Sequence, residues 1–260
     1  MKASNTLFKN GFVGLFAALL GLLSISTAHA QIFTTGSLAS NGSDIENTGT
    51  ILDAINFYDP AYGIYGNLPA ASNPNNPSNG GTPNPTLNGV AFTGEAYNAS
   101  LPGYTLTLTG PNVGIDDNRA GGVLSTDAIY PLVFSGVYSY YSSTPYAHLS
   151  VNDLTPGKTY SLQLFFDSEA GDTRSLFATD GSASSSTVTT PGPQFITDQF
   201  TATSSSETVA LTYTATLPVE LSGFVLTTTE AAPEPSTWTM LLSGAGLLAF
   251  WRIRTRCVRP

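Results

Sequence analysis

Residues 154–167 read LTPGKTYSLQLFFD, and this stretch decides the fold class of the chain. Pro156 and Gly157 are residue types that favour a tight turn, which delivers the chain into the segment that follows. From Tyr160 onward apolar and polar side chains alternate, with Phe165 as the one apolar residue on the second face. A period of two indicates a β-strand whose inner face is well filled.

The same alternation recurs with threonine on the outer face, as in 105–109 and 208–214. Threonine suits that face because β-branched side chains fit a pleated surface. Further strands are predicted at 51–57, 89–93, 130–138, 147–151, 174–178, 194–202 and 220–227. Clusters of Gly, Pro, Asn and Ser separate these short strands, and no convincing amphipathic helix interrupts them. The pattern predicts an all-β, antiparallel β-sandwich.

The sandwich is expected to occupy residues 31–230, a length that suits one β-domain. Within it, residues 67–86 are rich in Asn and Pro and have no strand pattern. We therefore predict an exposed, poorly ordered loop there.

Three phrases carry a resemblance to known folds: DIENTGTILDAIN at 44–56, LNGVAFT at 87–93, and the opening stretch at 154–166. Together they resemble the malectin-like and galactose-binding-like jelly rolls found in many sorted bacterial surface proteins. The resemblance implies a jelly-roll-like sandwich. The pattern LTPGxxY also opens strands in fibronectin-like domains, so a fibronectin- or immunoglobulin-like sandwich is the alternative.

The first thirty residues, 1–30, have the layout of a secretory signal peptide. Lys2 and Lys9 make a positive start, residues 12–25 are apolar, and Ala28 and Ala30 provide the small-x-small cleavage pattern. The apolar run is shorter than the roughly 20 residues that span a bilayer. We therefore predict export, with cleavage after Ala30.

The last thirty residues, 231–260, have three ordered parts. Pro233, Glu234 and Pro235 form an extended strip because proline disfavours helix and denies a ladder hydrogen bond. A helix over 237–251 would be about 22 Å long at about 1.5 Å per residue, short for a hydrocarbon core of about 30 Å. The arginines that follow stay on the cytoplasmic side by the positive-inside rule. These arginines are Arg252, Arg254 and Arg256.

This order of P-E-P, short apolar helix and arginine cluster resembles the PEP-CTERM sorting signal of Gram-negative bacteria that often produce exopolysaccharide. The resemblance implies that Pro233, Glu234 and Pro235 are recognised by exosortase, an integral-membrane protease that removes the helix. The expected partners are exosortase and the secretion machinery. The expected location is the cell envelope or the extracellular space, after a transient stage in the inner membrane with the C-terminus in the cytoplasm.

Composition excludes several function classes for residues 31–230. Only Arg119, Lys158 and Arg174 are basic there, so the surface is acidic and nucleic acid is an unsuitable partner. The single cysteine, Cys257, lies in the tail, which leaves the domain without a disulfide or a thiol nucleophile. His148 is expected on the polar face of its strand, and no carboxylate pair has a spacing that singles out an acid and a nucleophile. We therefore expect no enzymatic activity.

Two kinds of binding site are candidates. Tyrosines at 138–146 could stack on sugars from a loop, or could instead pack in the core. Two acidic groups could hold a structural calcium ion, or could be solvated turn residues; no other cofactor is expected. The glycan candidates are Tyr138, Tyr140, Tyr141 and Tyr146, and the calcium candidates are Asp116, Asp117 and Asn118 in one group and Asp167, Glu169 and Asp172 in the other.

The sequence therefore predicts a structural or adhesive protein of the cell surface or exopolysaccharide matrix. A carbohydrate-binding module is the first alternative. A glycoside hydrolase is the less favoured one.

Overall fold

The computed structural model describes residues 31–57, 84–95, 102–109, 112–117, 127–133, 135–140, 145–168, 173–181, 183–190, 192–214 and 220–229. The chain divides between Ala30 and Gln31 into two compact units, and all described residues belong to the second. Most of the predicted loop at 67–86 lies outside the described residues. At its end, Thr86 begins a short strand.

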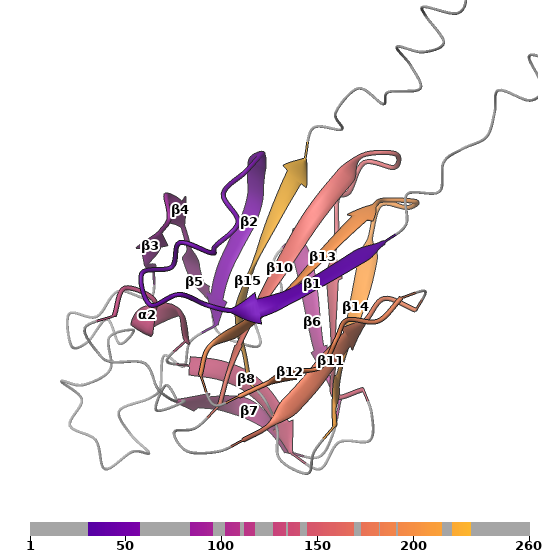
Figure 1. The fold of residues 1–260 in the computed structure, drawn as a ribbon. Helices are drawn as coiled ribbons and strands as arrows, with labels where there is room; N and C mark the ends of the chain where they lie inside the picture. The colour runs from indigo at the N-terminus through magenta and orange to yellow at the C-terminus, as the bar shows by residue number, and fades with distance from the viewer. Residues whose placement is uncertain are drawn as a thin grey trace, which may run out of the picture. The chain divides into compact units, whose positions relative to one another are not determined.

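Two sheets form the domain (Figure 1). The main path of the larger sheet is, in spatial order, β1 (Ile32–Ser37), β13 (Gln194–Thr201), β10 (Thr159–Asp167), β15 (Glu220–Thr229), β2 (Thr50–Phe57) and β5 (Thr93–Glu95). The pair β7 (Asn112–Asp117) and β8 (Ser135–Tyr140) joins this sheet through β15. The smaller sheet runs β12 (Val188–Thr189), β11 (Ser175–Thr179), β14 (Glu207–Tyr213), β9 (Ala147–Val151) and β6 (Tyr104–Leu108). A hairpin of β3 (Thr86–Leu87) and β4 (Val90–Ala91) and a short helix α2 (Tyr130–Val133) complete the described elements.

The strand order identifies a jelly roll. From β9 to β15 the chain passes to the opposite sheet at every step except between β11 and β12. The resulting orders, β2-β15-β10-β13 and β9-β14-β11-β12, are the B-I-D-G and C-H-E-F orders of a jelly roll. An immunoglobulin-type sandwich keeps several sequential strand pairs in one sheet. The predicted jelly-roll-like sandwich is thus confirmed, with one departure: β5 pairs with β2 in parallel.

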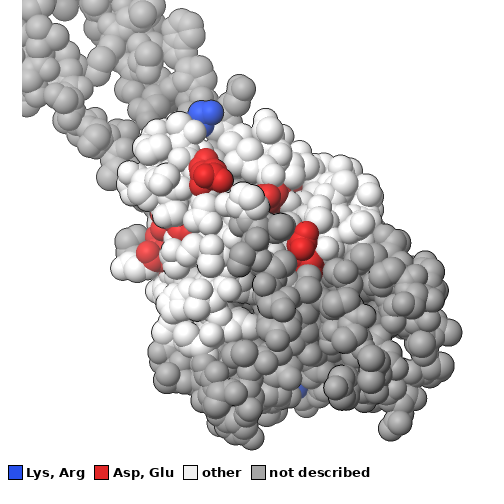
Figure 2. Space-filling model, turned by 180° about the vertical axis from the view of Figure 1, so that it is seen from behind, with Lys and Arg blue, Asp and Glu red and all other residues white. Residues whose placement is uncertain are grey.

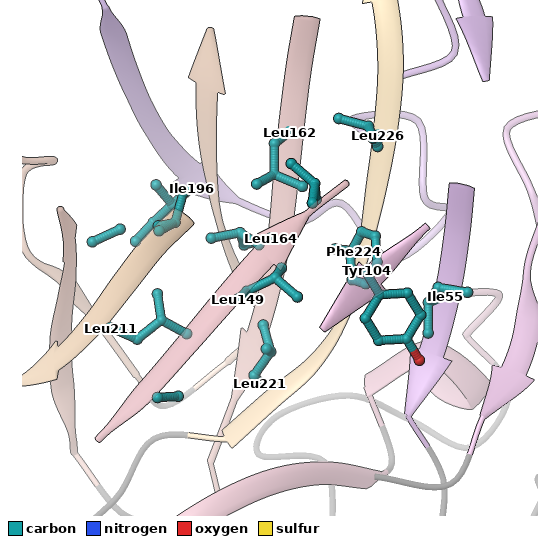
Figure 3. Packing of buried hydrophobic residues seen from close by; sticks show 14 of the residues in the cluster. Ile55, Tyr104, Leu149, Leu162, Leu164, Ile196, Leu211, Leu221, Phe224 and Leu226 are labelled. Atoms are coloured by element: carbon teal, nitrogen blue, oxygen red, sulfur yellow. The ribbon is translucent and has the colours of Figure 1, made fainter. Parts of the chain in front are cut away.

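The main core fills the space between the two sheets. Inward side chains from both sheets meet there, and Figure 3 shows Leu149, Leu164 and Tyr104 among them. The Tyr104 and Phe224 rings meet edge to face with centroids 5.1 Å apart. This geometry is one that aromatic pairs prefer, so the ring pair adds to the stabilisation by area burial.

A second apolar cluster covers the outer face of the larger sheet. It contains residues of β3, β4, α2 and the segment before β2, and Figure 1 shows β3, β4 and α2 beside β2 and β5. Strand β10 is therefore buried on both faces, although its sequence alternates. On the outer face of β10, the amide of Gln163 is hydrogen-bonded to the segment before β2. Its Oε1 accepts from the Glu46 N–H at 2.7 Å, and its Nε2 donates to the Asp44 carbonyl at 2.8 Å.

Three other segments differ from the sequence prediction. Residues 130–133 form α2 instead of the start of a strand, and Pro131 fits because proline is tolerated in the first turn of a helix. Asp116 and Asp117, predicted in a turn, end strand β7. The strand β1 was not expected, because IFTTGS at its position shows little alternation.

Candidate functional site

Tyr146, one of the predicted glycan contacts, is a core residue. Its side chain is 0% exposed, and its ring stacks on Tyr213 with centroids 3.9 Å apart and an interplanar angle of 10°. Burial raises the pKa of Tyr146 well above its ordinary value, so the hydroxyl stays protonated. Tyr141 and the side chains of Tyr138 and Tyr140 lie outside the described part of the chain. Tyr146 is consequently unavailable as a sugar contact.

A buried charged pair lies where β11 and β15 begin. Arg174 Nη1 and Glu220 Oε1 are 3.5 Å apart, with side chains 3% and 1% exposed. The backbone N–H of Arg174 donates to Thr190 Oγ1 at 3.0 Å, and the Ser168 hydroxyl donates to the same oxygen at 2.7 Å. The pair is therefore embedded in a hydrogen-bonded cluster, where removing one charge would strand the other.

Asp167 is the one calcium candidate whose side chain the structure describes. It lies opposite Glu220 in the pairing of β10 with β15, and its Oδ1 accepts from the Ser168 N–H at 2.8 Å. Its Oδ2 is buried without a hydrogen-bond partner. Burial raises the pKa of Asp167 to about 8, so the carboxyl is largely protonated at neutral pH.

The other calcium candidates cannot be assembled into a site here. Glu169, Asp172 and Asn118 lie outside the described residues, as do the side chains of Asp116 and Asp117. Among the described residues, no three His, Cys, Asp or Glu side chains are grouped as a metal would require. Asp167 and Glu220 are both buried, and Glu220 is paired with Arg174, so the cluster can clamp strands together but presents neither carboxylate to a large substrate.

A third buried carboxylate, after Asp167 and Glu220, was missed by sequence reasoning. Asp198 of β13 is fully buried, and its Oδ1 and Oδ2 both lie 2.9 Å from Nε2 of Gln31. Burial raises the pKa of Asp198 to about 7. A signal was available: in the alternation of β13, Asp198 shares a face with the core residues Ile196 and Phe200.

Among the described strand residues, the outer face of the smaller sheet has no Asp, Glu, Lys or Arg side chain and is rich in hydroxyl groups. His148 and Ser150 of β9 alternate with its buried residues, as expected, and the Ser150 hydroxyl lies 2.7 Å from that of Thr208. On neighbouring strands, Thr107 and Ala210 flank His148. Phe177 of β11 lies on this face too, half-buried. We call this surface the hydroxyl face.

Charge does not gather into a patch on the face that Figure 2 shows, where acidic side chains are separated by uncharged ones. The hydroxyl face can exchange hydrogen bonds with a neutral polymer through its serine and threonine side chains.

The tail that follows the domain contains a motif for protein sorting. The match to a known family begins two residues after β15 ends and covers residues 231–256. The chain carries a PEP-CTERM protein-sorting motif. This motif marks an exported protein that exosortase processes, as its P-E-P residues and arginine cluster indicated. The expected helix at 237–251 lies outside the described residues, and among the helices that are described none is long and apolar enough to cross a membrane.

The ectodomain before the PEP-CTERM motif resembles sugar-related structures only distantly. No curated protein matches the chain. The CBM22-1 xylan-binding domain from Paenibacillus barcinonensis aligns at 14% identity and a TM-score of 0.34 over 50% of this chain and 88% of that one. The CBM22-1-GH10 modules of a Clostridium thermocellum endo-1,4-β-D-xylanase, complexed with xylohexaose, align at 12% identity and a TM-score of 0.34 over 52% of this chain and 28% of that one. An exo-β-1,3-galactanase from Phanerochaete chrysosporium aligns at 10% identity and a TM-score of 0.29, over 54% of this chain and 31% of that one. The jelly-roll assignment rests on the strand order described above.

Proposed function

We propose that this protein is a structural or adhesive component of the cell surface or exopolysaccharide matrix, without enzymatic activity. The observation that carries the proposal is the position of the PEP-CTERM motif immediately after the last strand of a folded domain. Such an arrangement suits a chain whose tail serves for sorting and whose domain is the product that is delivered.

The buried acids support a non-enzymatic role. A glycosidase needs two carboxyl groups that flank a bound sugar. In the described part of the domain, the neighbouring pair Asp167 and Glu220 is sealed from solvent, and Arg174 neutralises one member. The glycoside hydrolase alternative is therefore not favoured by this pair.

Processing of the tail is the first test. Surface-extracted protein from the native host should yield no peptide that contains Trp251, because exosortase removes the segment beyond Pro233–Pro235. The change Glu234→Ala should cause unprocessed, Trp251-containing protein to accumulate. Glu230→Ala, which removes a neighbouring carboxylate outside the P-E-P strip, is the matched control and should be processed normally. Wild-type protein recovered mainly with Trp251 would contradict the proposal.

Glycan binding is a second candidate function, and the hydroxyl face is the observation that favours it. An aromatic ring beside hydroxyl groups is a common combination in sugar contacts, and Phe177 supplies the ring. Binding of the processed protein to neutral polysaccharides should weaken by about 1 kcal/mol or more in Phe177→Ala. Thr34→Ala, on the exposed edge strand β1, should bind as wild type does. Equal binding by both variants would contradict a role of Phe177 in glycan binding, and only the structural or adhesive role would then be supported.

A further inference from the structure

Gln31 lies at the junction that export is expected to create. Cleavage after Ala30 makes Gln31 the first residue of the mature chain, and the described domain also begins at Gln31. The next residue, Ile32, starts β1, which pairs with β13 as an edge strand of the larger sheet. The side chain of the new terminal residue therefore lies next to β13.

The amide of Gln31 is held by a buried carboxylate. Its Nε2 lies 2.9 Å from both Asp198 oxygens, and Asp198 points between the sheets, opposite Phe33 of β1 and Leu162 of β10. Hydrogen bonds to a carboxylate are stronger than those between neutral groups. Asp180 and Glu207 face Asp198 with like charge, so the Gln31 amide is the favourable partner that offsets them.

An N-terminal glutamine has its own chemistry. The neutral α-amine nitrogen attacks Cδ of the side-chain amide, a new N–Cδ bond closes a five-membered lactam, and the Cδ–Nε2 bond breaks. Nε2 leaves as ammonia with the proton that the amine gives up, so no oxidant or other co-reactant is needed. In this chain the departing atom is the one that donates to Asp198. Cyclisation would thus leave a buried carboxylate without the donor that holds it, which is unfavourable.

We propose that Asp198 keeps the N-terminus of the mature protein as an open glutamine by holding the Gln31 amide through its Nε2. The contact opposes cyclisation in two ways. It restrains the torsions of the side chain, and because attack requires the reacting atoms to approach within about 3–3.5 Å in line, a restrained Cδ reaches that geometry less often. It also stabilises the reactant relative to the lactam. The inference rests on the proposed export, through cleavage after Ala30.

The experiment follows loss of ammonia from the N-terminal peptide by mass spectrometry. Exported full-length protein is incubated at about pH 8, where Asp198 is mostly ionised, in native buffer and in strong denaturant, and the two rates are compared. We expect cyclisation to be at least about ten-fold slower in the folded protein, as loss of a charge-assisted hydrogen bond would give. Equal rates in the two solvents would overturn the proposal without any variant.

Two substitutions on β13 then assign the effect to Asp198. Asp198→Ala should bring the rate in native buffer close to the rate in denaturant. Gln199→Ala, a neighbouring exposed side chain, should cyclise as slowly as wild type. If Asp198→Ala does not fold, the wild-type rates in native buffer and in denaturant still test whether the folded domain slows cyclisation. Slowed hydrogen exchange of the Gln31 side-chain amide then gives a second measurement of the contact. An Asp198→Ala protein that folds and stays open as long as wild type would refute the assignment.

The same digest separates this inference from the proposed function. An N-terminal peptide that starts elsewhere than Gln31 overturns the inference while leaving tail processing intact. A Gln31 terminus on a chain that still contains Trp251 would count against sorting and leave the inference standing.

Discussion

Removing one oxygen atom from the core should stabilise this protein. The Tyr146 hydroxyl is buried without a hydrogen-bond partner, while its ring stacks closely on Tyr213. The substitution Tyr146→Phe keeps the ring and removes the hydroxyl. Burying an unpaired hydroxyl costs about 1–3 kcal/mol in protein mutants. We therefore expect the free energy of unfolding to rise by about 1 kcal/mol or more.

Tyr146→Ala should have the opposite effect. Deleting a buried aromatic ring costs about 3–5 kcal/mol, because packing is lost and a cavity remains. For a domain of about 200 residues, each kcal/mol moves Tm by roughly 2–4 °C, so the two variants should melt on opposite sides of the wild type. A solvent-exposed sugar contact would instead leave Tm nearly unchanged in both variants.

Chemical denaturation followed by circular dichroism gives these free energies. Thr208→Ala, at an exposed position on the hydroxyl face, is the control and should stay within about 0.5 kcal/mol of wild type. A Tyr146→Phe protein that is less stable than wild type by about 1 kcal/mol would refute the reasoning, because it would mean that the hydroxyl forms a favourable bond.

Two more predictions follow from the buried polar groups. Asp167 has a pKa of about 8 in the folded protein against an ordinary value of 3.8, so its contribution to stability is full below about pH 4 and is lost as the pH rises toward 8. Thermal melts should show Tm falling between about pH 5 and pH 8, and the fall should be smaller in Asp167→Asn; an unchanged slope would contradict this. Gln163→Leu should lower the free energy of unfolding by about 1–3 kcal/mol, since it leaves the Glu46 N–H and the Asp44 carbonyl without their partner, whereas the exposed Gln199→Leu on β13 should have little effect; denaturant titration measures both.

Local pattern was enough to place most strands. The alternation at 147–151 predicts β9 to the residue, and the Pro156-Gly157 turn correctly introduces β10. These signals are local because a strand that packs on one face has a period of two in its own sequence. The order of the strands in the two sheets is non-local, and only the resemblance pointed to it.

The failures share a physical cause. Gln163 looks like an outer-face residue, but the segment around Asp44 covers it from far away in the sequence. Tyr146 could have been core or surface, since an aromatic ring next to a strand fits both. The alternation of β13 does place Asp198 on the core face, but its partner, Gln31, comes from a distant segment and could not be predicted from the sequence around Asp198. Pairings between distant segments carry no local signature.

The central position of β15 in the larger sheet determines when that sheet can close during export. This strand pairs with β10, β2 and β8, yet it is the last strand that the structure describes, and it ends at Thr229. The larger sheet therefore has a gap in its middle until residues 220–229 have crossed the membrane, and a topology with so many distant pairings folds slowly. The PEP-CTERM motif starts at residue 231, two residues after that strand ends, so the two segments are exported almost together. A chain that stalls before this point exposes open strand edges and has no sorting motif in place, so closure of the domain and sorting depend on the same stretch of polypeptide, residues 220–256.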